Sequence, residues 1–213
     1  NAVANNMYGT YGNDKLDGIG GNDTTIGGAG NDTHTFDSKN DVLKEAKGGG
    51  TDTAVSENRG INLSNSQFLN IENATLSGNT DGLNLTGNTG KNKLTGNDGA
   101  NRIDGRGGDD SLSGKDGDDT LVWNKNAVKL DGGDGNDTVE VENANLNLTG
   151  KGGGIFRSTE GVHLIGNRTL TVTGNDVGAM SPDSKTLTLT SDGGGILLSG
   201  DPLTFLQNTT IVE

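Results

Sequence analysis

A single apolar position returns every nine residues through the middle of the chain. Nine-residue lines that start at Gly78, Gly87, Gly96, Gly105, Gly114, Trp123 and Gly132 each place one apolar residue in their eighth column. That column reads Leu85, Leu94, Ile103, Leu112, Leu121, Leu130 and Val139. One line buries little apolar surface alone, so the copies must stack to build a continuous core.

Glycine and an acid or amide occupy fixed polar columns of the same lines. Five lines keep glycine in the first and fourth columns, and their sixth column reads Asn92, Asn101, Asp110, Asp119 and Asp137. The lines at Gly78 and Trp123 lack the sixth-column acid, so the repeat decays at both ends. An earlier block, with lines at Gly9, Gly18 and Gly27, has Asp14, Asp23 and Asp32 in the sixth column and Leu16, Thr25 and His34 in the eighth. This block combines a full acidic column with a poor core, and Phe36 is expected to close its end.

The acidic columns point to a bound cation. Each eighth-column residue contributes roughly 1.5–3 kcal/mol when buried, but every coil must also order glycines that have a large backbone entropy. Carboxylates stacked at one height beside glycine carbonyls are hard oxygen ligands, and calcium accepts roughly six to eight of these. The sequence therefore predicts that calcium holds the turns together.

The pattern G-x-x-G-x-D/N-x-U-x, in which U is apolar, resembles the calcium-binding nonapeptide of the RTX (repeats-in-toxin) family. The resemblance implies an all-β fold: a parallel β-roll in which a nonapeptide supplies a turn and a short strand, and two nonapeptides form one 18-residue coil. It also implies that turn carbonyls and sixth-column side chains bind calcium. The ligand candidates are Gly9, Tyr11, Gly12, Asp14, Asp23, Gly27, Gly28, Gly30, Asp32, Asn92, Asn101, Gly105, Gly108, Asp110, Gly114, Asp116, Gly117, Asp119, Gly132, Gly133, Gly135 and Asp137.

In a roll of this kind, turns two lines apart lie on the same edge and share an ion. The expected pairs are Asp14 with Asp32, Asn92 with Asp110, Asn101 with Asp119, and Asp119 with Asp137. Asp23 is expected to lack a regular successor on its edge. Pairs with two carboxylates should bind more tightly than pairs that contain an asparagine, because ligand charge tunes calcium affinity.

Composition agrees with a cation-dependent fold. The chain has 213 residues, 38 glycines, no cysteine and a formal charge of −13. Low apolar content with high net charge favours disorder unless a cation binds. The acidity argues against nucleic acid and anionic membranes as partners, and no apolar run is long enough for a transmembrane segment. Absence of cysteine excludes disulfides and thiolate metal sites within these residues.

The columns divide the chain into four segments. Residues 1–36 form a first calcium-binding block, 37–77 an insertion with connecting coils, 78–140 a second calcium-binding block, and 141–213 a C-terminal β-rich region. Residues 40–47 are expected to form a short helical turn. Residues 141–213 alternate apolar and polar positions without a ligand column, which fits either a continued solenoid that caps the roll or a separate sandwich that serves attachment.

Three functions fit these features. The first is a calcium-binding module that folds after export and serves folding, secretion and scaffolding of an extracellular or cell-surface bacterial protein. The others are part of an RTX adhesin or surface-layer protein that binds host or cell-surface glycans, and the C-terminal module of a secreted enzyme. The acidic tail 203–213 is compatible with recognition by type I secretion machinery. No catalytic constellation is visible, and His34 and His163 have no second histidine or cysteine nearby, which favours solvated or edge-packed imidazoles.

Overall fold

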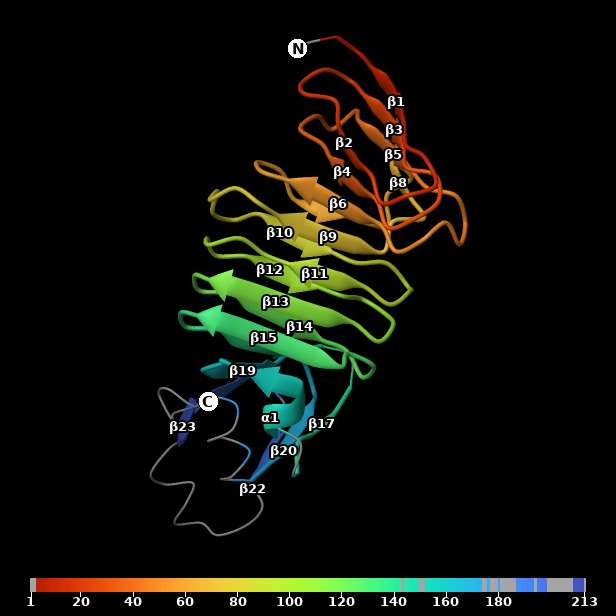
Figure 1. The fold of residues 1–213 in the computed structure, drawn as a ribbon. Coiled ribbons are helices and arrows are strands. Elements are labelled where there is room, and N and C mark those ends of the chain that lie inside the picture. The colour runs from red at the N-terminus through yellow and green to blue at the C-terminus, as the bar shows by residue number, and fades with distance from the viewer. Residues whose placement is uncertain are drawn as a thin grey trace.

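Short strands follow one another around a parallel solenoid (Figure 1). The computed structural model describes residues 3–142, 144–149, 152–173, 176, 180, 187–193, 195–198 and 209–212. Through both repeat blocks, consecutive strands alternate between two sheets, and every pairing is parallel. This is the all-β parallel roll that the nonapeptide pattern predicts.

One eight-stranded sheet runs from the first block into the C-terminal region. It contains β2 (Lys15–Asp17), β4 (Thr33–Thr35), β6 (Thr53–Ser56), β9 (Asn73–Leu76), β11 (Lys93–Thr95), β13 (Ser111–Asp116), β15 (Lys129–Asp134) and β18 (Phe156–Arg157). The alternate strands form two sheets, one after the other. The first contains β1 (Asn6–Tyr8), β3 (Thr24–Ile26), β5 (Val42–Lys44) and β8 (Phe68–Leu69). The second contains β7 (Ile61–Asn62), β10 (Asn84–Thr86), β12 (Arg102–Asp104), β14 (Thr120–Trp123), β16 (Thr138–Val141), β19 (Gly161–Leu164), β21 (Leu187–Ser191) and β23 (Thr209–Val212).

The strand register follows the two-line periodicity. Leu94 pairs with Leu112 and Leu112 with Leu130 in one sheet, while Leu121 pairs with Val139 in the other. Each step is two nonapeptides along the sequence. Residues in the same column of alternate lines therefore lie side by side, which is the geometry needed for neighbouring turns to share a bound ion.

The eighth column forms the core of the second block. All seven of its residues, from Leu85 to Val139, are at most 1% exposed. In the first block, Thr25 and His34 take the equivalent inward positions and are also buried. Phe36 packs within the core and does not end it: its ring meets that of Phe68 edge-on with centroids 5.1 Å apart, and the roll continues past it through β5 and β6.

The expected helical turn at residues 40–47 is wrong, because the chain there forms strand β5. Leu43 is 1% exposed and pairs with Thr25 of β3 and with Phe68 of β8. A helix would remove Leu43 from the inward column and break the parallel sheet. Within 37–77 the solenoid continues with slightly longer coils: Thr33 pairs with Thr53, Thr53 with Asn73, and Asn73 with Lys93.

Beyond residue 141 the described strands continue the parallel sheet with longer coils. Val139 of β16 pairs with Val162 of β19, which pairs in turn with Leu189 of β21. A further parallel sheet joins β17 (Leu146–Asn147), β20 (Thr169–Val172) and β22 (Gly195–Leu198), and α1 (Gly152–Ile155) is a single short turn. Of the two alternatives, a continued solenoid and a separate sandwich, the described strands form the continued solenoid. Of the tail 203–213, only β23 lies within the described residues; none of the helices described could span a membrane.

Candidate metal centre

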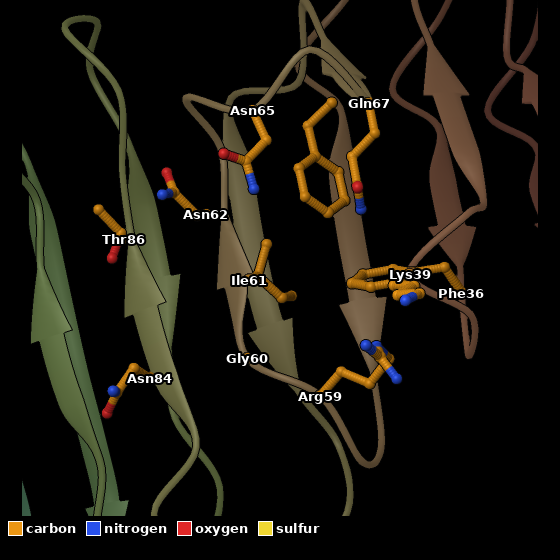
Figure 2. A pocket seen from close by; sticks show the side chains of 11 residues that line it. Phe36, Lys39, Arg59, Gly60, Ile61, Asn62, Asn65, Gln67, Asn84 and Thr86 are labelled. Atoms are coloured by element: carbon orange, nitrogen blue, oxygen red, sulfur yellow. The ribbon is translucent and has the colours of Figure 1, made fainter.

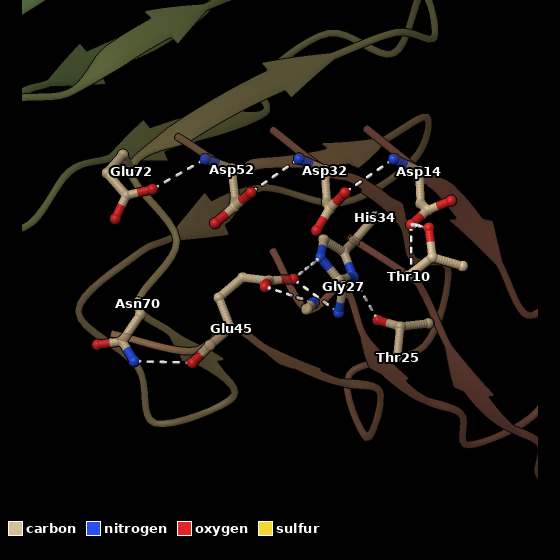
Figure 3. Close-up of polar contacts among 11 residues, drawn as sticks. Thr10, Asp14, Thr25, Gly27, Asp32, His34, Glu45, Asp52, Asn70 and Glu72 are labelled. Carbon is tan, nitrogen blue, oxygen red and sulfur yellow. Dashed lines mark hydrogen bonds and ion pairs between the residues drawn. The ribbon is translucent and has the colours of Figure 1, made fainter. Parts of the chain in front are cut away.

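Sixth-column side chains form a ladder along the edge that leads into the β2–β18 sheet. The backbone N–H of Asp14 donates to Oδ1 of Asp32 at 2.8 Å, and that of Asp32 donates to Oδ1 of Asp52 at 2.7 Å. The Asp52 N–H continues the ladder to Oε2 of Glu72 at 2.8 Å (Figure 3). Each carboxylate thus caps the turn of the preceding coil with one of its two oxygens.

A second ladder follows the other edge of the roll. The N–H of Asn101 donates to Oδ1 of Asp119, and the N–H of Asp119 donates to Oδ1 of Asp137, both at 2.8 Å. The Asp137 N–H extends the ladder to Oε2 of Glu160 at 2.9 Å. With the N–H of Asn92, which donates to Asp110 at 2.9 Å, all four pairs expected from the sequence lie in contact.

Three ladder residues have a second carboxylate oxygen with no hydrogen-bond partner in the part of the chain that the structure describes. Oδ2 of Asp32, Asp119 and Asp137 is buried without a donor among those residues, and each of the three is at most 1% exposed. Burying an ionised carboxylate without a compensating partner is strongly unfavourable. These oxygens therefore have the chemistry of ligands that face a cation.

Glycine leaves open the space that these oxygens face. A Cβ atom added to Gly114 would overlap both Oδ2 of Asp119 and the carbonyl oxygen of Gly132 in the next turn on that edge. At Gly132, an added Cβ would meet Oδ2 of Asp137 and the carbonyl oxygen of Ser158 in the same way. A carboxylate and a carbonyl thus converge beside each of these two glycines, a donor set that suits a hard cation such as calcium.

The pKa values of the ladder carboxyls reflect this burial. Desolvation raises the pKa of Asp119 to about 6 and, with repulsion from Asp119 and Glu160, raises the pKa of Asp137 to about 7. In the other ladder, desolvation, together with the nearby charges of Glu45 and Glu72, raises the pKa of Asp52 to about 6. The ladders therefore hold negative charge that the protein itself leaves uncompensated.

Comparison with known families explains this arrangement. Four copies of the RTX calcium-binding nonapeptide repeat match residues 1–33, 86–121 and 127–145. These parts of the chain are RTX calcium-binding repeats. RTX nonapeptides bind calcium, so the cation that fits the ladders is calcium. The repeats form a structural module and not a catalytic one. Comparisons with curated proteins and with solved structures gave no match.

Two ladder positions in the RTX repeats hold asparagine in place of aspartate, which changes their hydrogen bonds. The side-chain N–H groups of Asn92 and Asn101 donate to the carbonyls of Glu72 and Leu83, one coil earlier, at 2.7 and 3.0 Å. Their Oδ1 atoms accept the N–H groups of Asn88 and Asn97, so both amides are satisfied within the protein. Asp110 also has a partner for Oδ2, since Asn124 donates to it at 3.3 Å. These rungs offer a cation less charge and fewer free oxygens than Asp119 and Asp137 do.

Other predicted ligands can contribute only through the backbone. Tyr11 is 95% exposed, and Asp116 is also exposed. Gly12, Gly28, Gly30, Gly108, Gly117, Gly133 and Gly135 line the turns, and most have positive φ angles, for example 108° at Gly28 and 145° at Gly135. Such angles exclude most side chains, so glycine lets the turn backbone approach the neighbouring coil.

The structure also adds rungs that the nine-residue phase does not reveal. Asp23 has a regular successor, contrary to expectation, because its N–H donates to Oδ1 of Asp41 at 2.8 Å. Phe36 stands where the first glycine of that line would be, which hides the match; the spacing of 18 residues from Asp23 is the signal that remains. Asp52, Glu72 and Glu160 lie 20 to 23 residues beyond the rungs that they follow, because their coils are longer.

One described pocket is separate from the ladders. It has a volume of about 280 Å³ and lies where the β1–β8 sheet gives way to the sheet that begins at β7 (Figure 2). Lys39 and Arg59 line it together with aromatic and amide side chains, and no carboxylate does so. This pocket is therefore unsuited to a cation.

Proposed function

We propose that this chain is a calcium-dependent folding module of an exported bacterial protein. It stays largely unfolded where calcium is scarce, passes through a secretion apparatus in that state, and folds when it meets millimolar calcium outside the cell. The observation that carries this proposal is the set of buried carboxylate oxygens on Asp32, Asp119 and Asp137 that have no hydrogen-bond partner among the described residues.

The energetics support folding coupled to binding. A ligand that binds only the folded state stabilises it by about 2.7 kcal/mol per site when its concentration is about one hundred times the dissociation constant. A few such sites offset the hydrophobic stabilisation that the first block lacks, because Thr25 and His34 replace apolar residues in its core. Without the ions, the same sites place like charges side by side within a chain of net charge −13, which favours the expanded state.

Circular dichroism of the whole chain during a calcium titration tests the proposal. In calcium-free buffer at pH 7.5 we expect the spectrum of a largely disordered chain, and β signal should rise cooperatively on addition of calcium. Magnesium is the matched control, because it demands tight octahedral coordination and loses its water reluctantly. A chelated chain with the same spectrum as the calcium-loaded chain would contradict the proposal.

A further inference from the structure

A group of acidic side chains lies where the first repeat block meets the connecting segment. Asp32, Glu45 and Asp52 each offer a carboxylate oxygen, and these oxygens all lie within 4.8 Å of one another. All three residues are buried, at 1%, 5% and 1% exposure. Figure 3 shows Asp32 and Asp52 on the ladder with the Glu45 carboxylate facing them from the neighbouring turn.

Glu45 occupies the place of a first-column glycine. Gly9, Gly27 and Glu45 follow one another at intervals of 18 residues, and the N–H of Gly27 donates to Oε1 of Glu45 at 2.8 Å. A Cβ atom on Gly27 would overlap Oε1 of Glu45 and Oδ2 of Asp32 together. The glutamate thus adds a third carboxylate to a turn in which the repeat supplies only glycine.

The surrounding residues hold Glu45 in this orientation. Nε2 of His34 lies 2.5 Å from Oε1 of Glu45, and Nδ1 of His34 lies 2.7 Å from the hydroxyl of Thr25. The N–H of Gly28 donates to Oε2 at 3.1 Å, and the side chain of Asn70 donates to the Glu45 carbonyl at 2.8 Å. His34, which the sequence suggested is solvated or edge-packed, is buried and positions a carboxylate.

The charges in this group do not balance. Among the described residues, His34 is the only basic side chain in contact with the three carboxylates, so the group keeps at least two negative charges when all three are ionised, even with a protonated imidazole. Oδ2 of Asp32 is buried and has no partner within the described protein. A divalent cation among these oxygens would supply both the missing charge and the missing partner.

We propose that Asp32, Glu45 and Asp52 form a calcium site in which Glu45 adds a third side-chain carboxylate to the ladder, a ligand that turns with glycine at this position do not supply. Three carboxylates bind a hard dication, and calcium accepts them in monodentate or bidentate fashion. Because the imidazole already contacts Glu45, His34 is a positioning residue and not a ligand. The proposal rests on the calcium-binding module above but concerns one site within it.

Equilibrium dialysis of the whole chain at saturating calcium tests this site. Glu45→Gln and Asp52→Asn should each bind one ion fewer than the unmodified chain. Glu57→Gln is the matched control, because Glu57 is an exposed glutamate a short distance along the chain, and it should bind the full number. His34→Gln should keep the number of ions but weaken this site by about ten- to one-hundred-fold, as loss of a partner that orients a metal ligand does.

The outcomes separate the two proposals. If the unmodified chain binds no calcium, the folding proposal fails; if it binds calcium and Glu45→Gln binds as many ions as Glu57→Gln, only this site is overturned. Should Glu45→Gln fail to fold, crystals of the unmodified chain grown in calcium decide the question by anomalous scattering. A peak among the three carboxylates supports the site, whereas the absence of a peak, or an ion held by Nε2 of His34, overturns it.

Discussion

At the scale of single residues, the second carboxylate oxygen decides where charge must be neutralised. Asp119 uses one oxygen to cap the preceding turn and leaves the other buried without a donor, while both oxygens of Asp110 accept hydrogen bonds. We expect Asp119→Ala to weaken overall calcium binding by about tenfold or more, equal to about 1.4 kcal/mol, and Asp110→Ala to weaken it less. Calorimetric titration measures both, with the exposed Asp116→Ala as control. Equal losses at the two positions would contradict this ranking.

The sequence predicts most ladder residues that keep the nine-residue phase, although it misses Asp41, and it misses those that do not keep the phase. The contact between Asp119 and Asp137 follows from two lines of nine residues, because parallel pairing brings the same column together in successive coils. Glu72 and Glu160 reach the same ladders from coils of other lengths, so no fixed spacing marks them. Glu45 stands in a column that normally holds glycine, and only the folded turn shows that its side chain points inward.

At the scale of the elements, the turns depend on glycine wherever one coil approaches the next closely. An alanine methyl at Gly114 would overlap a carboxylate oxygen of its own turn and a carbonyl of the next, whereas Gly107 meets only one atom, at 3.9 Å, and has no positive φ. We expect Gly114→Ala to cost about 1–3 kcal/mol, as overpacking does, and to lower the melting temperature by about 2–4 °C per kcal/mol. Gly107→Ala should stay close to the unmodified chain. Thermal denaturation in saturating calcium checks both, and similar melting temperatures for the two variants would show that the turn tolerates a side chain.

The strands themselves are largely predictable because each needs only one inward residue per nine. Leu94, Leu112 and Leu130 stack in register as their column requires. The prediction fails at residues 40–47, where local composition suggested a helical turn but Leu43 completes the inward column of β5. Pairing with β3 and β8 supplies backbone hydrogen bonds to Val42, Leu43 and Glu45, so tertiary contacts override the local preference there.

At the scale of the whole molecule, folding depends on how far the negative charge of the ladder carboxylates is neutralised. Most rungs add a carboxylate beside the last, in a chain of net charge −13 with few apolar residues. Calcium and protons are two ways to neutralise the same groups, so they compete for the ladders and each favours the folded state. Calcium binding should therefore weaken as pH falls towards 6.

The proton linkage leads to a prediction for the calcium-free chain. Burial raises the pKa of Asp137 to about 7 and those of Asp52 and Asp119 to about 6, above the value near 4 of an unfolded aspartate. The folded state thus binds protons more tightly than the unfolded state, so its stability falls as pH rises from about 4 to about 7 and increases on acidification.

In calcium-free buffer, lowering the pH from about 7.5 to 5 should increase the β signal in circular dichroism. Asp137→Asn should reduce this response, because it removes the carboxyl with the highest of these pKa values. Repeating the titration in high salt, which screens exposed charges but not buried ones, separates this effect from general repulsion, and a spectrum that stays unchanged down to pH 5 would refute the linkage.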